Sequence, residues 1–175
     1  MQESPQQYTQ RIISNLNGRE PLRVQQETPR RLQKAIQSLS KPQLTRRPEP
    51  SKWSIAEILA HLADGELVAS WRMRLVIGSN GVPIQAFDQD VWAETFVYSK
   101  RDPKVSLETF RVLRENNLRM LKALPKELWE NYGMHSERGK ETIAHMVRMF
   151  AGHDLNHVAQ VEAIAKAARK KRKRN

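Results

Sequence analysis

The sequence of 175 residues contains no cysteine. Disulfide bonds, thiolate metal ligands and cysteine nucleophiles are therefore excluded, and any bound metal ion would be held by nitrogen and oxygen atoms. Long apolar runs are also missing, since none approaches the roughly 18 residues that a membrane-spanning helix needs. The first residues lack the basic and apolar parts of a secretory signal. These absences predict a single cytoplasmic domain with no membrane attachment.

Acidic residues are absent from the end of the chain, where residues 166–175 contain seven Lys and Arg residues. These seven supply most of the net charge of +11, so the rest of the chain carries only +4. Such a tail could bind nucleic-acid phosphates, or it could be the solvated end of a helix whose dipole favours cations there. No aromatic residues are interleaved with Arg elsewhere. The solvated helix end is therefore favoured, and nucleic acid is not an expected partner.

Strand-like alternation is scarce, whereas apolar residues at helical spacing recur along most of the chain. The polar opening predicts at most a short helix that ends near Gly18. Thr28 and Pro29 then have the residue types of a helix cap and a first helical position, which predicts that the first core helix begins there. Ser54 and Glu57 form a capping box that predicts the start of a long second helix running to about residue 77.

Two further helices are predicted in the second half. Ser106 is a candidate cap for a third helix that stops at Pro125, and a last long helix is expected to begin near Thr142. Four principal helices of this kind predict an all-α protein, an antiparallel four-helix bundle. The predicted organisation is an N-terminal extension or short helix (1–27), the bundle (28–165) and a basic C-terminal tail (166–175).

Three histidines lie on predicted helices. His153 and His157 are four residues apart, so their rings project from one helical face and can chelate a single ion. His61 lies near the apolar stripe of the second helix and could reach the same point. Spacing alone also fits ordinary core histidines that are hydrogen-bonded to a backbone carbonyl or to a neighbour such as Asp154 or Glu66.

Two longer segments resemble the DinB superfamily. The segment Trp53–Glu66, which contains His61, is similar to the second-helix signature of that family, and residues 153–162 resemble its final helix, with Gly139 and Thr142 shortly before. The resemblance covers roughly residues 28–165. It implies a DinB-type four-helix bundle, frequently a homodimer. It further implies that the three matching histidines bind a divalent ion, most often nickel or zinc.

Three histidines on one ion would leave coordination positions open, as in a catalytic site. Members of the superfamily are metal-dependent hydrolases or transfer low-molecular-weight thiols, so the resemblance implies a small-molecule substrate, with a non-catalytic metal-binding protein as the alternative. Carboxylates on helices are usually solvated or paired with cations. The weak candidates for catalytic residues, all beside the predicted ligands, are Asp64, Glu66, Asp154 and Gln160.

Other residues receive weaker interpretations. His135 lies in a connection and His145 lies eight residues before His153, so neither is predicted to be a ligand. Trp92 and Phe96 fall in the most irregular segment, where they could form a wall of the pocket or pack on the bundle as core.

Overall fold

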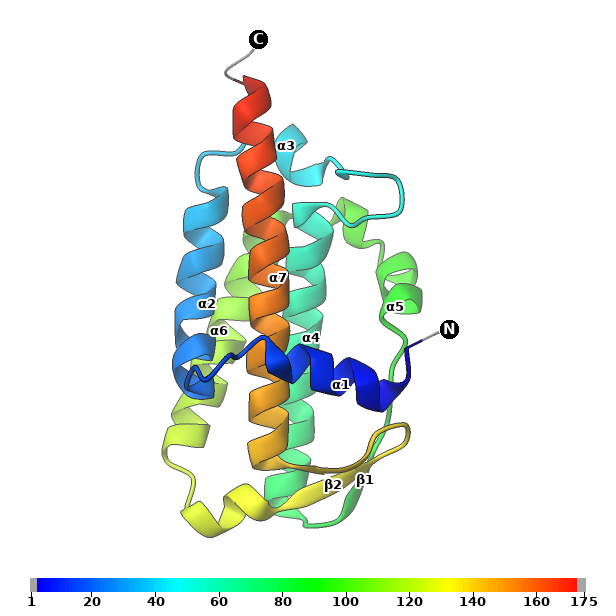
Figure 1. Cartoon of the computed structure of the whole chain (residues 1–175), viewed down its shortest axis with the longest axis vertical. Coiled ribbons are helices and arrows are strands. Elements are labelled where there is room, and N and C mark those ends of the chain that lie inside the picture. Colours follow the sequence, from blue (N-terminus) through cyan, green and yellow to red (C-terminus); the bar gives the residue numbers. More distant parts are fainter. Residues whose placement is uncertain (1–2, 173–175) are drawn as a thin grey trace.

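A computed structural model describes residues 3–172. Four long helices form a bundle and account for most of the chain (Figure 1). These helices are α2 (Pro21–Ile36), α4 (Ile55–Gly78), α6 (Pro103–Lys122) and α7 (Ile143–Arg172). The all-α class and the antiparallel four-helix bundle are confirmed. Of the predicted basic tail, residues up to Arg172 belong to α7, and 173–175 lie outside the described residues.

Two of the four helices run in each direction. In Figure 1, α2 and α7 rise toward the end of the bundle where the C-terminus lies, whereas α4 and α6 descend. The contacts agree: Gln25 reaches Val147 while Arg31 reaches Glu162, so α2 and α7 are parallel neighbours. The connection between α4 and α6 therefore returns along the length of the bundle, an arrangement that requires a long crossover.

The connections carry short elements. They are α1 (Pro5–Ser14) before the bundle, α3 (Lys41–Thr45) between α2 and α4, then β1 (Val82–Ile84), α5 (Gln89–Thr95) and η1 (Tyr98–Lys100) in the crossover, and η2 (Lys126–Glu130), β2 (Tyr132–His135) and β3 (Gly139–Thr142) before α7. In the sheet, β1 pairs parallel with β2, and β2 pairs antiparallel with β3. This sheet was not predicted from the sequence, because strands of three or four residues are too short to show alternation.

Helix starts were predicted with mixed success. The Ser54 cap is confirmed, with the Glu57 amide donating to its hydroxyl and the Glu57 carboxylate accepting from the Ser54 amide. The predicted start at Thr28 is wrong, because Glu20 caps α2. The predicted Ser106 cap is wrong as well, since Asp102 caps α6. In both cases an acidic residue directly before a proline forms the cap, and the proline takes the first helical position.

Pro29 lies inside α2 instead of at its start. Proline has no N–H, so the carbonyl of Gln25 one turn earlier loses its helical partner. Arg114 of α6 donates to this carbonyl at 3.2 Å. A buried side chain of a neighbouring helix therefore satisfies the acceptor that an interior proline leaves open.

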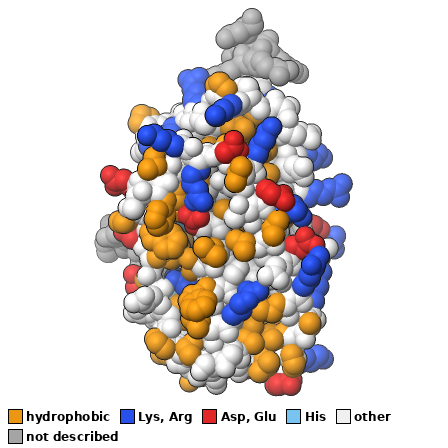
Figure 2. Space-filling model, turned by 180° about the vertical axis from the view of Figure 1, so that it is seen from behind, with side chains coloured by type: hydrophobic (Ala, Val, Ile, Leu, Met, Phe, Trp, Pro, Cys, Tyr) orange, Lys and Arg blue, Asp and Glu red, His pale blue; other side chains and the backbone are white. Residues whose placement is uncertain are grey.

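The core follows the apolar stripes of the four helices. One cluster of buried side chains joins α2, α4, α6 and α7 near the start of α4. A second cluster joins α4, α6 and α7 near the end of α4. On the face seen in Figure 2, acidic side chains lie among the basic ones, so the positive charge of this face does not form one continuous field. Among the described residues, none of the helices is both long and apolar enough to span a membrane.

Helix α1 crosses α7 at Gly152 (Figure 1). A Cβ atom at this position would lie 2.1 Å from the backbone oxygen of Ile12, so only glycine permits the close approach. The Asn15 amide donates to the Gly152 carbonyl at 3.3 Å, at the same crossing. The N-terminal segment is therefore attached directly beside His153.

The Gly152→Ala substitution is expected to lower the free energy of unfolding by about 1–3 kcal/mol, because the methyl group must displace the α1 backbone. Chemical denaturation and hydrogen exchange of α1 amides would measure this effect. The control is Gly65→Ala in α4, where an added Cβ meets nothing within 4 Å. That change should raise the free energy of unfolding by about 0.5–1 kcal/mol. Equal effects of the two substitutions would contradict the proposed role of the crossing.

Candidate metal centre

Two antiparallel helices position the three predicted histidines. His61 lies two turns into α4, whose start is fixed by the Ser54 cap, and His153 and His157 lie one turn apart on α7. One ring nitrogen from each of the three lies within 4.8 Å of the other two. The predicted convergence of the three rings is therefore confirmed.

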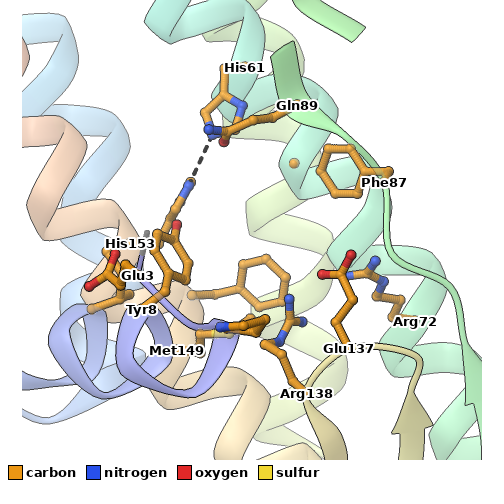
Figure 3. Close-up of a pocket in the computed structure, with 14 residues that line it drawn as sticks. Glu3, Tyr8, His61, Arg72, Phe87, Gln89, Glu137, Arg138, Met149 and His153 are labelled. Carbon is orange, nitrogen blue, oxygen red and sulfur yellow. Dashed lines mark hydrogen bonds between the residues drawn. The ribbon is translucent and has the colours of Figure 1, made fainter. Parts of the chain in front are cut away.

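The Nε2 atoms make contacts that hydrogen bonding cannot satisfy. His153 Nε2 lies 3.0 Å from His61 Nε2, drawn as a dashed line in Figure 3, and 3.1 Å from His157 Nε2. A ring nitrogen of neutral imidazole has either one N–H or one lone pair, so it makes only one good hydrogen bond. His153 Nε2 cannot therefore serve both neighbours. A cation between the rings would accept all three lone pairs at once.

Burial keeps the three imidazoles neutral. It lowers the pKa of His61 from 6.5 to about 3, with further repulsion from His157. It also lowers the pKa of His153 well below its usual value, to which His157, His61 and Arg114 add repulsion. The pKa of His157 falls to about 4 by burial, and Gln160 opposes this shift. Neutral imidazole is the form that binds metal ions, so the site is prepared for one at neutral pH.

The donor set fits a divalent ion that prefers nitrogen. Zinc binds histidine nitrogen at about 2.0–2.1 Å, and imidazole also suits nickel and copper. Two nitrogens on one zinc ion can be at most roughly 4.2 Å apart. The three ring nitrogens lie within 4.8 Å of one another, so small rotations of the rings would bring them within reach of one ion. His157 Nδ1 is buried without a hydrogen-bond partner. The side chain of Gln160, one turn further along α7, raises the pKa of His157 and so lies close to this ring.

A pocket of about 440 Å³ opens beside the histidines. His61 and His153 lie at one end of its lining, whereas Arg72, Glu137 and Arg138 lie together at another (Figure 3). Helix α1 covers one side. Because two of the three histidines face this space, a small molecule could reach their nitrogens, and the site is not a closed structural one.

The three carboxylates that the sequence offered as catalytic candidates form ion pairs with arginines. Asp64 accepts two hydrogen bonds of 2.8 Å from Arg101. Glu66 accepts from Arg114 at 2.7 Å, and Asp154 is also bound to Arg114. None of the three carboxylates lines the pocket with the histidines. Their proposed catalytic roles stay predictions.

Arg114 is the centre of a buried charge cluster that the sequence analysis missed. Its side chain is 2% exposed and pairs with both Glu66 and Asp154. Burial alone would lower the pKa of Arg114, but the attraction of Asp154 and Glu66 raises it above its usual range. Burial also raises the pKa of Asp154, against the pull of Arg114. This cluster fixes Asp154 on α7 directly beside His153.

The remaining aromatic and histidine residues are outside the three-histidine cluster. His135 is buried in β2 and His145 is half-buried on α7, and neither belongs to the cluster found among residues 3–172. Trp92 packs on Phe87 with ring centroids 4.5 Å apart. Phe96 is exposed, and neither it nor Trp92 lines the pocket.

One aromatic side chain packs directly on the centre, although the sequence analysis did not single it out. The ring of Trp53 lies 5.1 Å from that of His61, measured between centroids. Trp53 directly precedes the Ser54 cap, and this position in the sequence was the available signal. A large ring beside a helix cap is placed to pack over the first turns of α4.

Comparisons with known proteins identify a family and several relatives. The profile of the DinB superfamily matches residues 26–161. A protein of Oceanobacillus iheyensis named "Putative metal-dependent hydrolase OB0782" is 25% identical over 154 residues, which are 88% of this chain and 89% of the relative. A "Putative metal-dependent hydrolase" of Bacillus cereus is 26% identical over 141 residues, 81% of each chain.

A solved structure supports the fold. YfiT from Bacillus subtilis, described as "a probable metal-dependent hydrolase with an unusual four-helix bundle topology", aligns with a TM-score of 0.78 at 20% identity. The alignment covers 84% of this chain and 85% of that chain. With the profile match over most of its length, this chain belongs to the DinB superfamily.

Proposed function

We propose that this protein is a metal-dependent hydrolase in which His61, His153 and His157 hold one divalent ion, with zinc and nickel the best candidates. The observation that carries the proposal is the meeting of three neutral imidazole nitrogens at the end of an open pocket. A bound divalent ion can lower the pKa of water to about 7 and polarise a carbonyl group.

The protein's own residues have separate tasks in this proposal. The three imidazoles supply neutral donors, and the packing of Trp53 limits rotation of the His61 ring. Gln160 acts as a positioning residue for His157, because an acceptor for the second ring nitrogen fixes the tautomer of a ligand. Met149 and Phe150 give the pocket an apolar wall beside the histidines.

Hydrolysis is favoured over thiol transfer because the named relatives are described as hydrolases. Transfer of a low-molecular-weight thiol remains a prediction. It would use the same three ligands, and the chain's lack of cysteine is compatible with either reaction.

The first test is metal content. Protein purified without a metal-affinity tag is expected to contain about one divalent ion per chain, measured by inductively coupled plasma mass spectrometry. His157→Ala should lose at least about tenfold in metal affinity, because one of three ligands is gone. His145→Ala, on the same helix but outside the cluster, is the matched control. Equal metal content in both variants would overturn the proposed centre.

The second test is turnover. Panels of esters, amides and thiols with electrophiles should reveal saturable activity that His157→Ala abolishes and His145→Ala retains. Activity with esters or amides supports the hydrolase, and activity only with thiols supports the transferase. A protein that holds the ion with no turnover in any panel would favour the non-catalytic alternative.

A further inference from the structure

An arginine without an ion-pair partner lines the pocket beside the histidines. The Arg72 side chain is only 7% exposed. Within residues 3–172, its hydrogen bond goes to the backbone carbonyl of Gln85, and no carboxylate forms an ion pair with it. A buried charge is costly unless it is paired, and guanidinium has several N–H donors in a planar fork. Arg72 therefore has donors and charge to spare for a bound group.

A second arginine lies at the same end of the pocket. Arg138 is paired with the buried Glu141, at 2.6 and 3.1 Å. Burial, followed by repulsion from Arg138, lowers the pKa of Arg72 to about 10, so Arg72 stays charged at neutral pH. Glu141 is therefore paired with Arg138 and not with Arg72. The exposed Glu137 lies at the pocket rim and forms no ion pair with either.

Helix geometry connects this end of the pocket to the histidines. His61, Gly65 and Arg72 fall on one face of α4, because separations of four and eleven residues correspond to about one and three turns. Long side chains on a helix lean toward its N-terminus, so the Arg72 side chain extends back toward His61. Gly65, between them, has no side chain, and a Cβ built there meets nothing within 4 Å. The pocket wall is therefore open from the histidines to Arg72.

We infer that Arg72 binds the carboxylate of an acidic substrate whose reacting group lies at the three histidines. The position of the reacting group at the histidines rests on the proposed function, whereas the binding of a carboxylate by Arg72 does not. A planar carboxylate matches the fork of guanidinium, and its one negative charge would pair with Arg72 while Arg138 stays paired with Glu141. Phosphate would bring a second negative charge close to Glu137. The apolar wall of Phe87 and Met149 suits the chain that joins the two ends of the substrate.

The binding test needs no metal ion. Hexanoate and hexanamide have similar shapes but only hexanoate is charged, so their affinities for chelator-treated protein can be compared by calorimetry. Hexanoate is expected to bind at least about tenfold more tightly, as a charged hydrogen-bonded pair is worth roughly one power of ten or more. Equal affinities would overturn the inference. Stronger competition by methylphosphonate than by acetate would overturn the choice of carboxylate.

Three variants locate the site. Arg72→Met should abolish the preference for hexanoate, whereas Arg74→Met, an exposed neighbour on α4, should retain it. Gly65→Leu should block binding of hexanoate without unfolding the helix, because the space beside Gly65 is empty. If Arg72→Met does not fold, Gly65→Leu still tests whether hexanoate binds in this pocket. A preference that survives Arg72→Met or Gly65→Leu would contradict the assignment.

The turnover arm separates this inference from the proposed function. The 4-nitrophenyl monoester of adipate should have a kcat/KM at least about tenfold above that of 4-nitrophenyl hexanoate, and Arg72→Met should remove the difference. If no ester is hydrolysed but Arg72-dependent binding of hexanoate is found, the hydrolase fails and the carboxylate site stands. If esters are hydrolysed with no preference for the acidic one, the carboxylate site fails and the hydrolase stands.

Discussion

Replacing Arg114 with methionine is expected to lower the free energy of unfolding by about 3–5 kcal/mol. The substitution keeps most of the side-chain volume but removes the one cation within residues 3–172 that pairs with Glu66 and Asp154, which are 3% and 1% exposed. Two carboxylates would then remain buried without a cation beside them, although Asn117 still donates to Glu66 at 2.7 Å. The Gln25 carbonyl, left open by Pro29, would lose its donor as well. Urea denaturation with metal-free protein would measure the change.

An exposed ion pair on the same helix provides the control. Arg111 pairs with Glu108 and Glu115 on the surface of α6, so Arg111→Met should cost less than about 1 kcal/mol. Combining Arg114→Met with Glu66→Gln and Asp154→Asn should recover part of the loss, because no charge then remains unpaired. Similar effects of Arg114→Met and Arg111→Met would show that the buried cluster does not contribute as described.

The contrast between the histidines and this arginine cluster shows what sequence can reveal. The spacing of His153 and His157 on one helix is a local property, and the Ser54 cap sets the position of His61 along α4. The meeting of the two helices depends on the whole topology. It could be predicted here because the segments around the histidines resemble a known family. Without that resemblance, the same residues fit ordinary core histidines.

Buried charges are harder to predict. Arg114 and Asn117 lie at the spacing of Phe110 and Leu121, so they occupy core positions of α6. That pattern was the available signal. A charged residue on an amphipathic helix is usually assigned to the solvent face, and its partners Glu66 and Asp154 come from two other helices. The sheet was missed for a different reason, since strands of three or four residues are too short to show alternation. The starts of α2 and α6 were missed because Thr28 and Ser106 are as plausible as caps as Glu20 and Asp102.

Acidification is expected to destabilise the metal-free protein well before the carboxylates titrate. In the unfolded chain the histidines bind protons near pH 6.5, whereas in the folded chain burial holds the pKa of His61 at about 3 and that of His157 at about 4. Between these values the unfolded state binds more protons, so the free energy of unfolding falls as the pH falls. His157 alone contributes on the order of 3 kcal/mol to this loss between pH 6.5 and 4.

Chemical denaturation of metal-free protein at several pH values from 7.5 to 4.5 would measure the slope. The slope should be shallower in His157→Gln, because that variant lacks one of the groups that titrates only in the unfolded state. Zinc or nickel should reduce the loss over the same range, since an ion that binds only the folded ligands stabilises the folded state by mass action.

Because the folded imidazoles are already neutral at pH 5.5, metal binding by the folded protein should release few protons there. An ordinary exposed histidine site would release more, so strong proton release on binding at pH 5.5 would contradict the burial of these three rings.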